Sequence, residues 1–181
     1  LHLNNMSFKA YFAGGCFWCT EAIFNRVNGV EKVLPGYIGG SIKNPSYKEV
    51  CSGLSGHTEG VELVFDSNIV SYETLALIFF TTHDPTTLNR QGNDLGSQYR
   101  SAIFYETEKQ KQIVYDVIKK MEDEFVFENR IVTEVLPKTD FYYAEQEHQS
   151  FFDMNKQHPY CQAIISPKIN KFIKEYSGVI K

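Results

Sequence analysis

Several features that would define a specialised protein class are missing from this chain of 181 residues. Four cysteines are too few and too unevenly spread for the disulfide framework of a small secreted domain. The most apolar stretch, LALIFF (75–80), is far shorter than the roughly 18 apolar residues of a membrane span. The N-terminal LHLNNMSFKA lacks a basic segment followed by an apolar run, so no secretory signal is expected. These absences favour a cytoplasmic protein without a membrane partner.

Basic charge is also scarce. The chain has 18 Lys and Arg against 22 Asp and Glu, a formal net charge of −4. Binding to nucleic acid depends on clustered Lys and Arg that neutralise phosphates, and no such cluster occurs, so no nucleic-acid partner is expected. Aromatic rings are plentiful, with 14 Phe and 11 Tyr against one Trp, and we expect such rings to line any pocket.

The domain organisation is simple, because the chain has no internal repeat, low-complexity tract or linker. We expect one monomeric domain over 1–181, with 1–6 as a disordered leader or an expression remnant. The patterns predict strands over 7–15, 30–40 (interrupted at Pro35), 57–66, 99–105 and 131–137, and helices beginning at Cys16, Ser71, Thr107, near 144 and at Ser166. Because no full helix separates 30–40 from 57–66, the sheet should be mixed, in an α+β fold.

The stretch AYFAGGCFWCTEAIF (10–24) is the richest in chemistry, since a cysteine follows two glycines where a strand pattern gives way to a helical one. Unpaired N–H groups and the dipole at a helix N-terminus stabilise a thiolate, so we predict a reactive Cys16 with a lowered pKa. Cys19, one turn later, either approaches Cys16 as a redox partner or packs in the core. Of the adjacent Phe17 and Trp18, at least one should lie near the surface beside Cys16.

No metal is expected at these cysteines. Zinc needs four ligands, and the chain has no second Cys-x-x-Cys and no Cys or His pair at ligand spacing. Cys51 has no visible partner and is interpreted as a packing residue.

Glu59 is the most informative residue outside this stretch. HTEGVELVFD (57–66) alternates like a strand and places Glu59 on one face with Val61, Leu63 and Phe65. If that face is the core side, loss of solvation raises the pKa of Glu59 and leaves a neutral acid that donates a proton. The alternative is a strand end that bends into solvent.

Three more polar residues are candidates for the same site. Tyr47 and Tyr99 offer phenol donors, although any one of 11 tyrosines also suits the core or the surface. Asp94 lies in QGNDLG, where turn chemistry alone accounts for an Asp.

At this point the chain resembles the A-type methionine sulfoxide reductases, the peptide-methionine (S)-S-oxide reductases, from Phe12 to about Lys174. The resemblance is carried by four motifs in order: GGCFWC (14–19), YKEVCSGLSGHTEGVELVFD (47–66), HDPTTLNRQGNDLGSQYRSAIFY (83–105) and FYYAEQEHQSFF (141–152). It implies a two-layer α/β sandwich with a ferredoxin-like core, a single catalytic domain and no cofactor.

The resemblance also implies roles for the candidate residues. Cys16 attacks the sulfoxide sulfur, and Phe17 and Trp18 form the apolar pocket for the methyl group of the substrate. Glu59, together with Tyr47 and Tyr99, hydrogen-bonds the sulfoxide oxygen, and Glu59 is the acid. Asp94 positions the polar side of the pocket or the incoming reductant. Neutral donors suit this task because thiolate attack pushes charge onto the oxygen.

The implied products are methionine and a sulfenic acid on Cys16. A sulfenic acid condenses with a nearby thiol to a disulfide, which a dithiol protein such as thioredoxin then reduces. Cys19 replaces the glycine that many relatives carry, and Cys161 in HPYCQ resembles their distal resolving cysteine. We favour Cys19, because the AIISPKINKF that follows Cys161 predicts an ordered helix rather than a glycine-rich tail.

Three alternatives remain open from the residues alone. A general thiol–disulfide oxidoreductase would use Cys16 and Cys19 without needing Glu59. A metal- or haem-binding module would need histidine ligands as well. A cysteine acyl-transfer enzyme would need a histidine base, which the sequence does not place.

Overall fold

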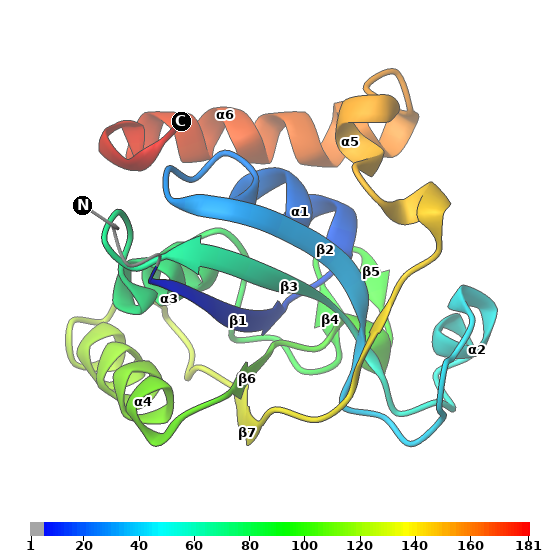
Figure 1. Ribbon diagram of the computed structural model, residues 1–181, viewed down its shortest axis with the longest axis horizontal. Coiled ribbons are helices and arrows are strands. Elements are labelled where there is room, and N and C mark those ends of the chain that lie inside the picture. Colours follow the sequence, from blue (N-terminus) through cyan, green and yellow to red (C-terminus); the bar gives the residue numbers. More distant parts are fainter. Residues whose placement is uncertain (1–5) are drawn as a thin grey trace.

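A six-stranded sheet in the order β7-β6-β1-β3-β2-β8 runs through the computed structural model, which describes residues 6–181 (Figure 1). The expected leader over 1–6 therefore lies outside the described residues except for Met6. The strands are β1 (Ser7–Ala13), β2 (Val30–Ile38), β3 (Thr58–Asp66), β6 (Ala102–Tyr105), β7 (Glu134–Pro137) and β8 (Phe141–Tyr143); β4 (Arg90–Gln91) and β5 (Asp94–Leu95) form a separate hairpin.

The sheet is mixed, as the sequence predicts, because β6 and β7 are parallel while the other neighbours are antiparallel. The expected break at Pro35 is wrong: β2 continues through Pro35, which lies opposite Val61. β8 pairs only with 36–38, so Pro35 lies where β2 has become an edge strand and a missing N–H is tolerated.

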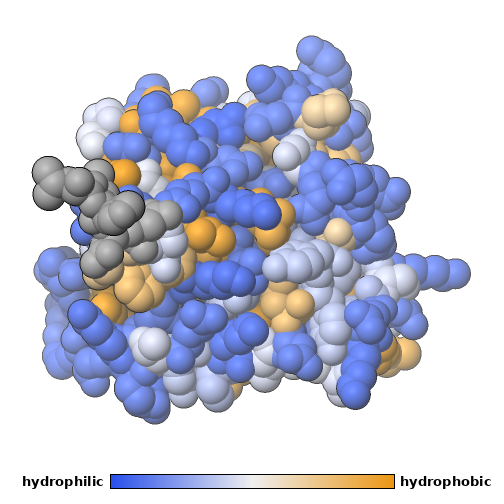
Figure 2. All heavy atoms as spheres, viewed as in Figure 1, coloured by the Kyte–Doolittle hydropathy of each residue, from blue (hydrophilic) through white to orange (hydrophobic). Residues whose placement is uncertain are grey.

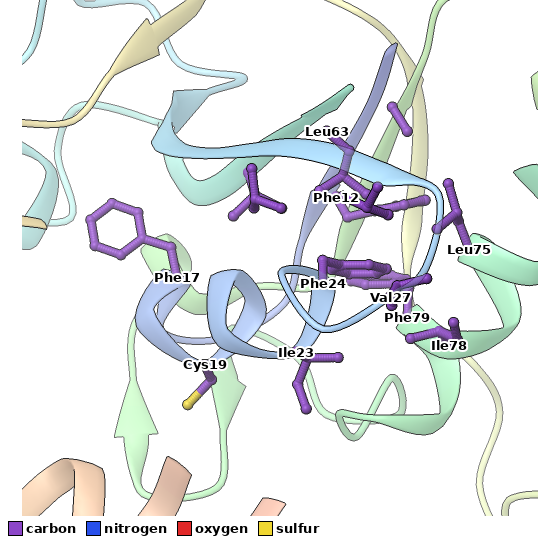
Figure 3. Close-up of a cluster of buried hydrophobic side chains, with 14 of the residues drawn as sticks. Phe12, Phe17, Cys19, Ile23, Phe24, Val27, Leu63, Leu75, Ile78 and Phe79 are labelled. Carbon is purple, nitrogen blue, oxygen red and sulfur yellow. The ribbon is translucent and has the colours of Figure 1, made fainter. Parts of the chain in front are cut away.

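Helices cover the face of the sheet that carries the main core. They are α1 (Phe17–Phe24), α3 (Tyr72–Thr81), α4 (Glu108–Asp123) and α6 (Ser166–Glu175), with the short α2 (Tyr47–Cys51) and α5 (Phe151–Met154) nearer the ends of the strands. In Figure 1, α1 lies between the sheet and α6. Phe12 from β1 stacks between Phe24 of α1 and Phe79 of α3, with ring centroids 5.3 and 5.1 Å away (Figure 3).

The alternation predicted for 57–66 is confirmed. Val61 and Leu63 are fully buried in the core beneath the helices, and Glu59 shares their face of β3. The predicted caps Ser71 and Thr107 also hold, since their hydroxyls accept from the backbone N–H groups of Thr74 and Gln110. The sequence also predicts a capping box between Thr107 and Gln110, but the Gln110 side chain accepts the backbone N–H of Glu106 instead.

Some predicted boundaries are wrong. Asn28-Gly29 in the sequence predicts the C-terminal end of the first helix, but α1 already ends at Phe24. The helical spacing of apolar residues over 114–125 predicts that Phe125 faces inward. Phe125 is instead 87% exposed, because α4 ends at Asp123 and Phe125 follows with a φ of 53°. The strand predicted for 99–105 begins only at Ala102, and Tyr99 ends a 3₁₀ turn.

The segment 144–155 is not one helix. Ser150 adopts a left-handed conformation that separates a 3₁₀ turn (Gln146–His148) from α5, and its N–H donates to Glu21 Oε2 at 2.9 Å. Burial raises the pKa of Glu21 to about 7. Ser166 and Pro167 do begin α6, which continues from a π-helical turn (Cys161–Ile165).

Residues 6–181 contain no helix with the length and apolarity needed to cross a membrane. The face shown in Figure 2 is mostly hydrophilic, with small apolar patches between the polar side chains.

Gly36 on β2 generates a stability prediction. A Cβ there would lie 2.5 Å from the carbonyl oxygen of Tyr142 and 2.4 Å from the Phe141 ring. The β8 backbone can move away only by disturbing its pairing with β2. We expect Gly36→Ala to lower the free energy of unfolding by about 1–3 kcal/mol in urea denaturation. Gly178→Ala is the control, since a Cβ there meets nothing within 4 Å. Equal unfolding midpoints for the two variants would contradict this reading of the β2–β8 contact.

Candidate active site

The turn between β1 and α1 sets the position of Cys16. Gly15 has a φ of 79°, and its N–H donates to the carbonyl of Tyr99 at 3.2 Å. A Cβ on Gly14 would lie 2.8 Å from the His83 ring, and one on Gly15 would lie 2.6 Å from the Gln91 side chain. Two glycines before a cysteine predict open backbone space around the thiol, but here they let these two side chains pack against the backbone. Cys16 is the N-cap of α1, as predicted.

Glu59 lies beneath the first turn of α1. Its Oε1 accepts the backbone N–H of Phe17 at 3.1 Å, and only 1% of the residue is exposed. Burial raises the pKa of Glu59 to about 8, against the lowering effect of the Phe17 N–H, and nearby Asp94 raises it further. The carboxyl is therefore mostly protonated at pH 7. This is the neutral acid that the sequence predicts if Glu59 lies on the core side of its strand.

The prediction of a lowered pKa for Cys16 is wrong. Burial, then the Glu59 carboxyl and Cys19, raise the pKa of the Cys16 thiol well above its usual value, and a backbone hydrogen bond from Trp18 opposes them. Desolvation of a charged sulfur outweighs the stabilisation from the helix terminus. The resting site consequently holds two protons, one on the thiol and one on the carboxyl.

Two phenols lie within electrostatic reach of Glu59. Tyr47 begins α2, and its N–H donates to Glu145 Oε2 at 3.0 Å while Tyr37 donates its hydroxyl to Oε1 at 2.8 Å. Burial, followed by neighbouring groups that include Glu59, raises the pKa of Tyr47 and of Tyr99. Both side chains are neutral hydrogen-bond donors.

Phe17 and Trp18 divide between core and surface, as the sequence predicts. Phe17 is buried against Tyr37, with centroids 5.7 Å apart, whereas Trp18 is half-buried. The indole stacks on Phe151 at 3.6 Å and meets the edge of Tyr160 at 5.8 Å.

His148 is a residue that sequence reasoning missed. Its Nδ1 accepts the indole Nε1–H of Trp18 at 3.1 Å, and burial lowers its pKa, so the ring is neutral. An indole N–H only donates, which fixes the His148 proton on Nε2. The spacing of His148 from Cys16 carries no local signal; only the packing of 144–155 on α1 joins them.

The same tautomer argues against a metal at the cluster of Glu145, Glu147 and His148, whose ligand atoms lie within 4.8 Å of one another. A protonated Nε2 has no lone pair for an ion. Both carboxylate oxygens of Glu145 already accept hydrogen bonds, from the Tyr37 hydroxyl and the Tyr47 backbone N–H.

A cavity of about 260 Å³ opens beside the first turn of α1. It is lined by Gly14, Cys16, Cys19, Gln91, Gly92, Asn93, Asp94, Tyr160, Ile164 and Lys168. The cavity thus gathers Cys16, Cys19 and Asp94, while Glu59, Tyr47 and Tyr99 are not among its lining residues.

Tyr160 is the second residue that sequence reasoning missed, since nothing local distinguishes it from ten other tyrosines. Its hydroxyl donates to Asp94 Oδ2 at 2.7 Å and lies 3.8 Å from Cys19 Sγ. A turn residue on the β4–β5 hairpin and a cysteine on α1 are thereby connected.

The remaining cysteines differ in exposure. Cys19 is 4% exposed, and Figure 3 shows its sulfur on the side of α1 away from the sheet. Cys161 is fully buried in the π-helical turn. Cys51, expected to pack in the core, is exposed on α2 beside Tyr47.

A neutral carboxylic acid and phenols close to a cysteine that shares a cavity with a second thiol are the parts of a thiol-dependent oxidoreductase. The family model for peptide methionine sulfoxide reductase matches residues 8–179. The chain belongs to the peptide methionine sulfoxide reductase family.

Individual relatives agree with this assignment. The chain is 49% identical over 172 residues to "Peptide methionine sulfoxide reductase MsrA" of Saccharolobus solfataricus, covering 95% of this chain and 96% of the relative. Reduced Mxr1 of Saccharomyces cerevisiae is 30% identical, with a TM-score of 0.79 over 87% of this chain and 91% of that one. Mxr1 in complex with Trx2 aligns at 20% identity, with a TM-score of 0.56 over 82% and 86% of the two chains.

The pKa of Glu59 predicts how stability changes with pH. Between about 4.5 and about 8 the folded chain holds a proton on Glu59 that the unfolded chain has lost. Stability therefore falls as pH rises through this window, by about 1.4 kcal/mol per pH unit from this group. We expect Glu59→Gln to remove that slope in urea denaturation at several pH values. The difference between the two curves cancels the contribution of Glu21, whose pKa is about 7 and which both proteins retain; parallel curves between about pH 5 and pH 7 would refute the assignment.

The hydrogen bond from Trp18 to His148 predicts a spectroscopic change. Trp18 is the only tryptophan, so the emission of the protein reports on this indole alone. In His148→Leu the indole loses its acceptor and gains solvent contact, and we expect emission to move to longer wavelength. In His148→Asn the amide oxygen replaces Nδ1, and the wild-type maximum should return. Identical spectra for the Leu variant and the wild type would show that the bond does not hold the ring.

Proposed function

We propose that this chain reduces the S epimer of methionine sulfoxide, free or in proteins, by attack of Cys16 on the sulfoxide sulfur. The observation that carries the proposal is the buried, neutral Glu59 bound to the first N–H of the helix that Cys16 caps. A sulfoxide oxygen becomes strongly basic as sulfur is attacked, and an acid with a pKa of about 8 is matched to protonate it near neutral pH.

The first step balances without an external reductant. The Cys16 sulfur attacks the sulfoxide sulfur, Glu59 protonates the oxygen, and the S–O bond of the substrate breaks as oxygen passes to Cys16. Methionine leaves, Cys16 becomes a sulfenic acid, and the thiol proton restores Glu59. Tyr47 and Tyr99 add hydrogen bonds to the developing charge, which explains why neutral phenols are useful here.

Apolar contacts supply the rest of the substrate site. Trp18 offers a half-buried indole face fixed by Phe151 and His148, a suitable wall for the methyl group. Phe17 supports that wall from the core side. Asp94 lines the cavity and positions its polar side.

Cys19 is the resolving thiol in this proposal. It shares the cavity with Cys16, and its backbone N–H bonds to the Cys16 carbonyl at 3.1 Å. Cys161 is fully buried in a helical turn, so it would have to leave the core first. A dithiol protein of the thioredoxin class then reopens the disulfide; Mxr1, solved in complex with Trx2, supports this choice of reductant.

The fold and setting complete the proposal. Strand order β6-β1-β3-β2, with α1 after β1 and α3 after β3, supports a ferredoxin-like core in a two-layer sandwich. One main core runs through all the long helices and supports a single domain over 1–181. We further infer that the protein is a monomer. We also infer that it works in a reducing cytoplasm, because its four cysteines are free thiols.

A general thiol–disulfide oxidoreductase is the second candidate, favoured by the Cys16–Cys19 pair alone. It gives no role to a buried acid, so Glu59 separates the two functions.

Anaerobic single turnover with a peptide methionine S-sulfoxide tests the proposal. Wild type should release methionine and lose two thiols, one from Cys16 and one from Cys19. Cys16→Ser should release none, and Glu59→Gln should be slower by about 10² or more. Cys19→Ser should release methionine without forming a disulfide, whereas Cys161→Ser should form it normally.

The opposite results are equally informative. Methionine release by Cys16→Ser would refute the reductase mechanism. Disulfide formation that survives Cys19→Ser and fails in Cys161→Ser would make Cys161 the resolving residue.

A further inference from the structure

The contacts of Cys19 single out Tyr160, which the reductase mechanism above does not use. Tyr160 follows α5 in sequence and reaches across the cavity to both Asp94 and Cys19. Its hydroxyl is thus the junction between a thiol on α1 and a carboxylate on the β4–β5 hairpin.

The direction of these hydrogen bonds follows from the proton count. A phenol has one proton, and the Tyr160 hydroxyl donates it to Asp94 Oδ2 at 2.7 Å. The Cys19 Sγ at 3.8 Å must then be the donor to the Tyr160 oxygen. The three groups form a chain oriented to carry a proton away from Cys19.

The Cys19 thiol must lose its proton before its sulfur can attack a sulfenic acid. Burial raises the pKa of the Cys19 thiol, and the Lys168 ammonium opposes that rise. Only a thiolate attacks a sulfenic acid effectively. With 4% of Cys19 exposed, bulk water has poor access to its proton.

We propose that Tyr160 is a catalytic residue of the second half-reaction, passing the proton of Cys19 to Asp94 while Cys19 attacks the sulfenic acid on Cys16. This inference rests on the proposed function, and specifically on Cys19 as the resolving thiol. Asp94 is accordingly the proton acceptor of disulfide formation.

The step balances as written. A bond forms between the sulfurs of Cys16 and Cys19, and the S–O bond of the sulfenic acid breaks. Tyr160 gives its proton to Asp94 and regains one from Cys19. The departing hydroxide takes the Glu59 proton and leaves as water. Solvent afterwards returns the proton from Asp94 to Glu59, so the net products are a disulfide and water.

The decisive measurement compares the two half-reactions in the same full-length chain. Under anaerobic single turnover, quenched samples give the rate of methionine release, and mass spectrometry after alkylation gives the rate of disulfide closure. The ratio of closure to release should fall at least about tenfold in Tyr160→Phe and in Asp94→Asn. Sulfenic acid on Cys16, trapped by dimedone, should accumulate in both.

The matched control is Tyr176→Phe. That hydroxyl is bonded to Thr81, so its removal also deletes one partly buried phenol contact, but away from the cavity. The ratio should stay at the wild-type value. A second readout separates proton transfer from packing: closure in Tyr160→Phe should become first order in hydroxide, as solvent takes over from the phenol.

Two outcomes overturn the inference, and they can be told apart from failure of the proposed function. Closure ratios within twofold of wild type in both variants, with the disulfide still between Cys16 and Cys19, would leave the reductase intact and remove the relay. A disulfide between Cys16 and Cys161 in the wild type would remove the relay because Cys19 would not react. Methionine release by Cys16→Ser would instead refute the reductase itself.

Discussion

The hydrogen bond between Glu59 Oε1 and the backbone N–H of Phe17 is the constraint on which this site depends. It joins the middle of the sheet to the first turn of α1, and it brings an acid to the residue next to Cys16. Its setting is dry enough to keep the carboxyl protonated to about pH 8. A charged carboxylate there would repel both a thiolate and the negative charge that grows on a sulfoxide oxygen. In the proposed mechanism, burial therefore makes Glu59 a proton source.

The segment 144–155, which follows β8, packs against α1 and holds several side chains of the site in place. Glu145 holds the start of α2 and so places Tyr47, while His148 and Phe151 fix Trp18. Glu21 on α1 anchors the left-handed Ser150 that lets this segment turn. Contacts from one segment thus position both the Tyr47 donor and the Trp18 ring.

The polar side has a different source. Asp94 comes from the β4–β5 hairpin, Tyr160 from the turn before α6, and Cys19 from α1. Each element belongs to a separate part of the sequence, and they meet at the cavity beside α1. In the proposed mechanism Glu59 serves both half-reactions, whereas Tyr160 serves only disulfide closure, so closure can be altered without methionine release.

The sequence alone determined the elements whose signals are local. Alternation in 57–66 predicted the buried face of β3 and with it Glu59, and the glycine turn before Cys16 predicted a cysteine at a helix N-terminus. Motif order was enough to identify the family. Helix ends such as Phe24 and Asp123 were missed, because fraying and left-handed residues such as Phe125 depend on neighbouring packing rather than on periodicity.

Only the tertiary structure decided the protonation and the partners. The dipole of α1 predicts a thiolate at Cys16, yet the surrounding protein removes water from the sulfur and raises its pKa instead. His148 and Tyr160 carry no signal that separates them from other histidines and tyrosines, since their roles come from residues 130 and 66 positions away. Burial and long-range contact are properties of the folded chain, and no local pattern encodes them.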